Sequence, residues 1–258
     1  MASHEDLALR LRNAYRAGAV PPLRDGLDTG DADGAYAVQY LNTLHWQSDG
    51  RRIVGRKIGL TAATVQAQLG VDQPDFGVLF DDMHVADGGR IDMTRFVQPK
   101  AEAEVALVLA RDVDAPDANR VMIEAAIDHV CAAIEIVDSR IADWKISFAD
   151  TVADNGSSAA FVLSETRVPP KGLDLWSCGM VLELNDRVAS LGAGAACLGH
   201  PLDAAVWLAQ TLAARGDPLR AGDIVLTGAL GPMVGIAPGD RVRATIGGLG
   251  TCSFVCER

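Results

Sequence analysis

Hydrophobic and polar positions follow two different patterns along the chain. Apolar side chains recur at four-residue spacing from Leu7 to Tyr15, and a similar spacing occurs over residues 35–45. Because one face of an α-helix repeats every three to four residues, both stretches are predicted to be helices. From residue 51 onwards, short β-rich runs separated by Gly and Pro turns replace this spacing. The pattern therefore predicts a small helical N-terminal part, residues 1–50, and a β-rich domain, residues 51–258.

The β-rich part contains seven runs that are predicted to be strands. These runs are Arg52–Ile58, Val105–Ala110, Ala132–Val137, Ala159–Leu163, Gly179–Leu184, Asp223–Leu226 and Arg241–Ile246. Two further helices are expected, one over about residues 119–129 and one from Pro201 to a stop at Gly216. Strands and helices do not alternate regularly, so a doubly wound parallel sheet fits poorly. The predicted fold class is a mixed α+β fold.

The composition and charge of the chain narrow the class of protein. Of its 258 residues, 49% are hydrophobic and 22% are charged, which is typical of a globular protein with a sizeable core. The formal net charge of −11 argues against a surface for nucleic acid or an anionic membrane. The five cysteines are scattered without a CxxC pair, and the N-terminus lacks an apolar signal segment. We therefore expect a cytoplasmic protein with free thiols and with no nucleic-acid or membrane partner.

The stretch QPKAEAEVALVLARDV contains two carboxylates, Glu102 and Glu104, in an otherwise apolar strand. Alternation along a strand sends both to one side, and sends Ala103 and Val105 to the other. One explanation is an edge strand, whose acidic residues face water and discourage sheet pairing. The run AAIEIVDSR favours a second explanation, because Glu135 stands among Ile and Val and is costly to bury without a compensating cation. Three glutamates from two strands could then share one metal ion.

The donor types at this candidate site restrict the metal. A set of carboxylates without His or Cys suits Mg²⁺ or Mn²⁺ far better than Zn²⁺. None of the five histidines occurs in an HExxH motif or a similar ligand spacing. The sequence therefore disfavours a zinc hydrolase.

The run VGRKIGL places a basic residue, Lys57, inside a predicted strand between Gly55 and Gly59. The glycines leave room around the lysine, and burial would remove water from it. Such a setting lowers the pKa of a lysine towards the range that is useful for proton transfer. The alternative is an ordinary lysine on an edge strand.

Two further segments are polar or rich in glycine. Residues 150–158, DTVADNGSS, are expected to form a polar loop whose Ser157 and Ser158 could hydrogen-bond a ligand carboxylate. No GxSxG motif is present, so a serine hydrolase is not supported. Residues 191–199, LGAGAACLG, have glycines spaced GxGxxxxG without a strand–turn–helix frame, which does not match a dinucleotide-binding loop.

Seven motifs, taken in order, resemble the 2-keto-4-pentenoate (2-hydroxypenta-2,4-dienoate) hydratase family of the fumarylacetoacetate hydrolase superfamily. They are VGRKIGLT, LGVDQPDFG, EAEVALVL, EIVDSRIADWKI, DTVADNGSS, LGAGAACLGHP and TGALGPMV. The resemblance extends from about residue 20 to the C-terminus, and seven ordered motifs are much more specific than any single one. It implies a mixed β-roll core with a small helical N-terminal part, and a homo-oligomer of at least two subunits.

The resemblance also implies roles for individual residues. Its metal ligands match Glu102, Glu104 and Glu135, its catalytic residues match Lys57 and Asp75, and its substrate-binding residues match Leu60 and Ser157. Lys57 is then expected to move protons, and Asp75 to position water or to tune the lysine. The chain departs from the family at one position, because the family's loop usually reads DNAS and Gly156 here replaces the Ala. A glycine at this position is expected to loosen the loop.

The implied reaction is the addition of water to a 2-hydroxydienoate in the bacterial meta-cleavage breakdown of aromatic rings, with Mg²⁺ or Mn²⁺ as cofactor. The product would be 4-hydroxy-2-oxopentanoate. The alternative within the superfamily is 2-oxo-3-hexenedioate (4-oxalocrotonate) decarboxylase, which shares the metal glutamates. An acylpyruvate hydrolase is less expected, because no histidine is placed to activate water. A non-catalytic partner of a pathway enzyme is disfavoured by the presence of Lys57 together with all three glutamates.

Overall fold

The computed structural model describes residues 1–258, which fold into six α-helices, five short 3-10 helices and thirteen strands. The α-helices are α1 (His4–Ala17), α2 (Ala32–Ser48), α3 (Ala63–Leu69), α4 (Arg120–Ala126), α5 (Phe148–Ala153) and α6 (Pro201–Ala214). The strands are β1 (Ile53–Gly59), β2 (Asp75–Phe80), β3 (His84–Val85), β4 (Gly89–Asp92), β5 (Pro99–Leu109), β6 (Ile127–Asp138), β7 (Ser158–Leu163), β8 (Gly179–Leu184), β9 (Arg187–Ala193), β10 (Ile224–Ala229), β11 (Val234–Gly235), β12 (Arg241–Ile246) and β13 (Gly250–Glu257). None of the helices combines the length and the apolar character needed to cross a membrane.

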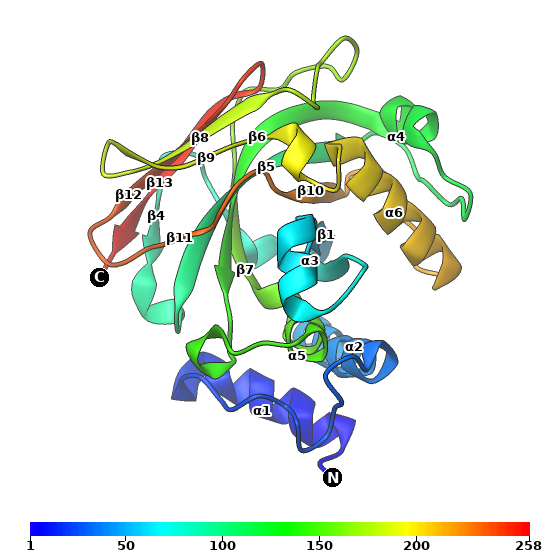
Figure 1. The fold of residues 1–258 in the computed structure, drawn as a ribbon, viewed down its shortest axis with the longest axis vertical. Helices are drawn as coiled ribbons and strands as arrows, with labels where there is room; N and C mark the ends of the chain where they lie inside the picture. Colours follow the sequence, from blue (N-terminus) through cyan, green and yellow to red (C-terminus); the bar gives the residue numbers. More distant parts are fainter.

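The strands form one sheet of eight strands and one of five. The larger sheet has the order β2-β1-β10-β5-β6-β7-β3, with β11 beside β5, and the smaller has the order β4-β13-β12-β8-β9. Strand β1 runs parallel to β10, whereas β5 is antiparallel to both β10 and β6, so the larger sheet is mixed. In Figure 1 the long strands β5 and β6 curve through the molecule, with the smaller sheet on one side and α4 and α6 on the other. This arrangement confirms the predicted α+β fold with a mixed β-roll core.

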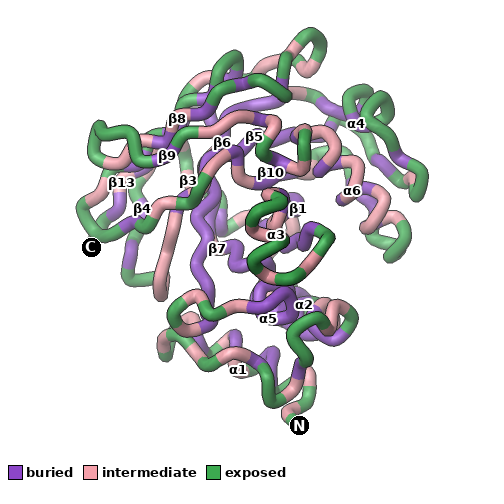
Figure 2. The backbone as a smooth tube through the Cα atoms, in the orientation of Figure 1, coloured by how far each residue is buried: buried purple, intermediate pink, exposed green.

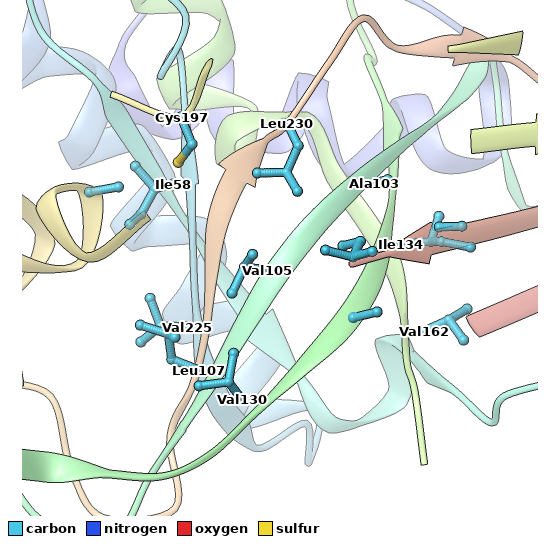
Figure 3. Packing of buried hydrophobic residues seen from close by; sticks show 14 of the residues in the cluster. Ile58, Ala103, Val105, Leu107, Val130, Ile134, Val162, Cys197, Val225 and Leu230 are labelled. Atoms are coloured by element: carbon cyan, nitrogen blue, oxygen red, sulfur yellow. The ribbon is translucent and has the colours of Figure 1, made fainter. Parts of the chain in front are cut away.

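The main hydrophobic core lies on one face of β5 and β6. Figure 3 shows Ala103, Val105 and Leu107 of β5 packed with Ile134 and Val162 from the neighbouring strands. Because side chains alternate along a strand, the glutamates of β5 face the opposite side. Strands β5, β7 and β10 are buried along most of their length, whereas α3 has no buried residue (Figure 2).

Helices α1 and α2 pack together with α5 (Figure 1). Their shared apolar cluster includes Leu7, Leu11, Val38, Phe148 and Val152. The helices predicted from the four-residue spacing are confirmed, and Leu7 and Leu11 of α1 and Val38 of α2 are buried on their apolar faces. The N-terminal helices therefore share a core with a segment that follows β6 in the sequence.

The helix expected over residues 119–129 is shorter than predicted. Helix α4 ends at Ala126, and the apolar residues that follow it belong to β6. Strand β6 pairs with β5 over nearly its whole length, with Ile127 opposite Leu109. The apolar pattern continues without a break through this junction, so the local sequence did not reveal where the pairing with a distant strand begins.

The polar loop expected at residues 150–158 is partly helical. Residues 150–153 complete α5, and Ser147 caps this helix by accepting a hydrogen bond from the Asp150 N–H. The Asp150 carboxylate in turn accepts from the Ser147 N–H at 2.7 Å. This reciprocal capping box starts a helix in a stretch that turn composition alone assigns to a loop.

Candidate active site

Three glutamates meet on two central strands of the larger sheet. Glu102 of β5 lies opposite Glu135 of β6 in the antiparallel register, and Glu104 follows on the same face of β5. One carboxylate oxygen from each lies within 4.8 Å of the others. Strand β5 starts at Pro99 and lies between β10 and β6, so the edge-strand explanation is wrong. The predicted convergence of the three carboxylates is what the structure shows.

Two of these carboxylates are deeply buried, and the third, Glu102, is half-buried at the cavity. Glu104 and Glu135 are 0% exposed. Burial raises the pKa of Glu102 to about 7, and burial with the neighbouring carboxylates raises the pKa of Glu104. Glu104 Oε2 accepts the Gly228 N–H at 2.8 Å, but Glu104 Oε1 and both Glu135 oxygens have no hydrogen-bond partner. Buried carboxylate oxygens without partners are costly, and an all-oxygen donor set fits a hard divalent cation.

Lys57 lies beside this cluster, with its Nζ 3.2 Å from Glu135 Oε2. The contact is an ion pair between two buried side chains, which are 4% and 0% exposed. Strand β1 lies between β2 and β10, so Lys57 is not on an edge strand. Burial lowers the pKa of Lys57, but the carboxylates of Glu135, Asp75 and Glu102 outweigh burial and raise it. The expected lowering of the pKa is therefore wrong, because carboxylates from other strands surround the ammonium group.

Asp75 begins β2 and lies opposite Gly59 of β1. Its residue is 1% exposed, and neither carboxyl oxygen has a hydrogen-bond partner. Burial raises the pKa of Asp75, and the Lys57 ammonium partly offsets this effect. A buried carboxyl group without protein partners is available to hydrogen-bond a ligand.

Ser157 lies in a tight turn that is packed against Lys57. Asn155, Gly156 and Ser157 all have left-handed backbone conformations, with φ of 58°, 59° and 56°. The Asn155 side chain accepts the Val78 N–H at 2.7 Å and donates to the Val78 carbonyl at 2.9 Å, which fixes the turn to β2. Gly156 is buried, and a Cβ atom there would lie 3.2 Å from Lys57 Cδ. The glycine therefore suits the backbone conformation of a closely packed turn, and this turn is not the loosened loop expected from the sequence.

Arg140 fixes the start of the same turn. Its guanidinium Nε donates to Asp154 Oδ1 at 2.6 Å, and its Nη2 donates to the Asp154 carbonyl at 2.6 Å. Arg140 is 0% exposed and Asp154 is 3% exposed. This buried ion pair holds the residue that immediately precedes the left-handed turn.

A cavity of about 340 Å³ joins these groups. Of the site residues expected from the sequence, its wall contains Lys57, Leu60, Asp75, Glu102 and Ser157. Glu104 and Glu135 are not part of the wall and are buried beside Glu102. The Ser157 hydroxyl has no hydrogen-bond partner, so it is also available to a ligand.

Several wall residues were not identified from the sequence. They are the polar or aromatic residues Lys100, Trp144 and Thr151 and the apolar residues Val65, Leu69, Ile146 and Met233. Strand alternation contained the signal for Lys100, because it precedes Glu102 by two residues and so shares its face. The apolar wall residues carry no such signal, since they come from segments that only the tertiary fold brings together.

Comparison with known proteins identifies the family. Residues 52–255 match the model of the fumarylacetoacetate (FAA) hydrolase C-terminal domain. The chain belongs to the fumarylacetoacetate hydrolase family. Among its relatives in this family is 2-keto-4-pentenoate hydratase 1 of Dechloromonas aromatica, which is 52% identical over 254 residues, 98% of this chain and 97% of the relative. The 2-keto-4-pentenoate hydratase of Paraburkholderia xenovorans is 52% identical over 248 residues, 96% of this chain and 92% of the relative.

A solved structure of the same family has nearly the same fold. It is 4-oxalocrotonate decarboxylase from Pseudomonas putida G7, complexed with magnesium and adipate. The two structures superpose with a TM-score of 0.92 over 99% of each chain, at 35% sequence identity. The resemblance found in the seven ordered motifs is thus confirmed by relatives that match nearly the full chain.

Proposed function

We propose that the protein is a divalent-metal-dependent hydratase, which adds water to 2-hydroxypenta-2,4-dienoate (2-keto-4-pentenoate) and forms 4-hydroxy-2-oxopentanoate. Lys57 carries this proposal, because it lines the cavity and lies 3.2 Å from Glu135 of the glutamate cluster. A proton carrier and a cluster able to hold a cation thus stand at one small cavity. The hydratase names of relatives that are 52% identical over almost the whole chain support the same reaction.

Glu102, Glu104 and Glu135 would hold the metal ion, for which we propose Mg²⁺ or Mn²⁺. The buried oxygens without partners and the absence of nitrogen or sulfur donors in the cluster support a hard cation. The magnesium in the similar decarboxylase structure agrees with this choice. When bound, such a cation stabilises negative charge on the C2 oxygen of the substrate.

The reaction needs a proton at C5, a water molecule at C4 and a second proton at C3. We assign these proton transfers to Lys57, whose ammonium group lies at the cavity wall. Lys57 would deliver a proton to C5 and regain one from the C2 hydroxyl group, and would then pass to C3 the proton that the water loses as its oxygen bonds to C4. The unpartnered carboxyl oxygens of Asp75 can accept a hydrogen bond from the attacking water or from Lys57. The Ser157 hydroxyl can donate to a substrate oxygen, while Leu60 contributes an apolar part of the wall.

The second candidate is 2-oxo-3-hexenedioate (4-oxalocrotonate) decarboxylase, favoured by the structural match at a TM-score of 0.92. Two observations favour the hydratase over it. Sequence identity is 52% to the named hydratases and 35% to the decarboxylase. The cavity wall at Val65, Leu69, Ile146 and Met233 is apolar, which suits the uncharged end of a pentadienoate better than a second carboxylate.

We further propose that the protein acts in the cytoplasm, in meta-cleavage catabolism of aromatic compounds, as a homo-oligomer. Its five cysteines are all free and buried, which agrees with a reducing compartment. Val188 and Leu191 of the edge strand β9 are 60% and 62% exposed, and such apolar side chains on an unpaired edge support self-association. A small-molecule 2-hydroxydienoate is the proposed partner of the cavity.

An assay with freshly generated 2-hydroxypenta-2,4-dienoate tests the proposed activity. We expect metal-dependent loss of the dienol absorbance, abolished by a chelator, and a product heavier than the substrate by one water. Release of CO₂ from 2-oxo-3-hexenedioate without hydration of the pentadienoate would move the assignment to the decarboxylase. Metal binding without turnover of either substrate would contradict both enzymatic assignments.

A further inference from the structure

Lys100 is the second basic residue of the cavity wall. It lies on β5 two residues before Glu102, so both side chains share one face, with their Cα atoms roughly 7 Å apart. Lys57 and Lys145 pair with carboxylates, at 3.2 Å and 2.9 Å. The Lys100 ammonium instead lies over the ring of Trp144, 4.1 Å from its centroid. Lys100 is therefore the cationic residue of the cavity that forms no ion pair with a protein carboxylate.

The position of Trp144 is fixed by its surroundings. Asp143 and Trp144 both have left-handed backbone conformations, with φ of 58° and 55°. The indole N–H donates to the Gln98 carbonyl at 3.1 Å, and the Gln98 side chain donates to the Ser139 carbonyl at 2.8 Å. A non-glycine pair in this backbone region persists only where surrounding contacts hold it. The ring therefore holds the Lys100 ammonium at the cavity without neutralising it.

The charges of the site give Lys100 a role in ligand binding. The cavity and the cluster contain the carboxylates of Asp75, Glu102, Glu104 and Glu135 and the ammonium groups of Lys57 and Lys100. Their formal charge is −2, which one divalent cation brings to zero. Without Lys100 the loaded site would carry −1, in a protein whose net charge is already −11. Such a site would repel an anionic substrate.

We propose that Lys100, seated on Trp144, is the subsite that binds the C1 carboxylate of the substrate. This assignment rests on the proposed function, because 2-hydroxypenta-2,4-dienoate has a single carboxylate, next to the C2 oxygen. Lys100 neighbours Glu102 on the same strand face, so the acid end of the substrate lies at the glutamate cluster. The apolar wall at Val65, Leu69 and Met233 is left for the C4–C5 end.

Calorimetric binding of 2-oxopentanoate in the presence of Mg²⁺ tests the subsite without turnover, because this saturated acid has no double bond to hydrate. The variants are Lys100→Met, Lys100→Arg and the matched control Lys145→Met, which removes the same charge from an exposed lysine outside the cavity wall. We expect Lys100→Met to weaken binding roughly 10- to 100-fold and Lys100→Arg to retain most of it. Lys145→Met should bind as the unmodified protein does. In turnover, Lys100→Met should raise KM more than it lowers kcat.

Binding of adipate, a dicarboxylate, tests the alternative that Lys100 binds a carboxylate at the distal end of a ligand. Equal affinity of Lys100→Met and Lys145→Met for 2-oxopentanoate would overturn the proposal, since general electrostatics would then explain any change. Loss of adipate affinity alone would also overturn it, because Lys100 would then bind a second, distal carboxylate. The wild-type hydration assay is separate, so failure of the proposed function is recognised independently of these binding results. Thermal unfolding of each variant identifies any that fails to fold, and Lys100→Arg then provides the comparison.

Discussion

Lys57 combines burial, charge and access to the cavity in one side chain. Replacing it with Met keeps the length of the side chain and removes the proton carrier. We expect kcat of Lys57→Met to fall at least about 100-fold, because general acid–base catalysis commonly contributes that much. The three glutamates remain, so calorimetry should still detect Mg²⁺ binding. Retention of more than a tenth of the turnover would remove Lys57 from the proton transfers.

Glu102 links metal binding to pH. Its pKa of about 7, raised mainly by burial, means that the metal-free folded protein holds a proton there at pH 6 and loses it by pH 8. Ionisation without a cation destabilises the folded state as pH rises through 7, whereas Mg²⁺ binds only the ionised form. Both effects increase the stability that Mg²⁺ adds to the folded protein as pH rises. The gain in Tm on adding Mg²⁺ should therefore be a few degrees larger at pH 8 than at pH 6.

The control for this pH effect is Glu102→Gln, in which the gain in Tm on adding Mg²⁺ should be small at both pH values. An equal gain at pH 6 and pH 8 in the unmodified protein would contradict the link between Glu102 and the metal.

The site residues differ in how far the sequence could predict them. Glu102 and Glu104 were predictable as a pair because strand alternation is a local property. The pKa of Lys57 was not, because its direction is set by Glu135 and Asp75, which lie on β6 and β2. The partners of a charge are known only once distant strands are paired.

The turn that carries Ser157 depends on the connection between β6 and α5. Arg140 follows β6 and binds Asp154 through two side-chain contacts and through its own N–H, which donates to Asp154 Oδ2 at 2.8 Å. Arg140→Met leaves this buried carboxylate without its cation. We expect a loss of about 3–5 kcal/mol in the free energy of unfolding, measured with urea. Turnover of the remaining folded enzyme should also fall, because the turn is no longer fixed.

Arg241→Met is the matched control, since it removes an exposed arginine that pairs with Asp186 on the surface. Exposed ion pairs contribute little, so its urea midpoint should stay close to that of the unmodified protein. Equal midpoints for Arg140→Met and Arg241→Met would show that the buried pair does not stabilise the fold.

At the level of elements, regular hydrophobic periodicity predicted helices and strands well, whereas the junctions between elements were predicted poorly. Strands β8 and β12 match the predicted bounds, and α6 starts at Pro201 as expected. Strands β2, β3, β4, β9, β11 and β13 were not predicted. Strand β2 joins the sheet through pairing with β1, and β9 exposes most of its residues, so neither displays a clear alternation of its own.

The whole molecule has an exposed edge at the smaller sheet, where β9 presents Val188 and Leu191. We expect light scattering after size exclusion to give a mass of at least twice 27.2 kDa. Leu191→Lys adds a charge to this edge and should shift the population towards the monomer. Val121→Lys, at an apolar residue on α4 that is 75% exposed, is the control and should leave the mass unchanged. A monomeric unmodified protein would contradict the proposed assembly.

The overall architecture was predictable in class but not in arrangement. Irregular spacing of strands and helices was enough to exclude a doubly wound sheet, and the ordered motifs implied the β-roll. The parallel pairing of β1 with β10, which places Gly55 opposite Ile224, joins segments that lie far apart in the sequence. No local pattern encodes such a pairing, because both strands would look the same beside other neighbours.

The pairing of Glu102 with Glu135 across β5 and β6 makes the glutamate cluster a test of correct folding. A slip of one residue between the two strands would turn the side chains of one strand to the opposite face and separate the carboxylates. A misaligned chain would then have no cluster with which to bind the ion. Metal added during refolding should therefore bind and stabilise only molecules in the native register. The ion would then favour correct strand pairing before it takes part in any reaction.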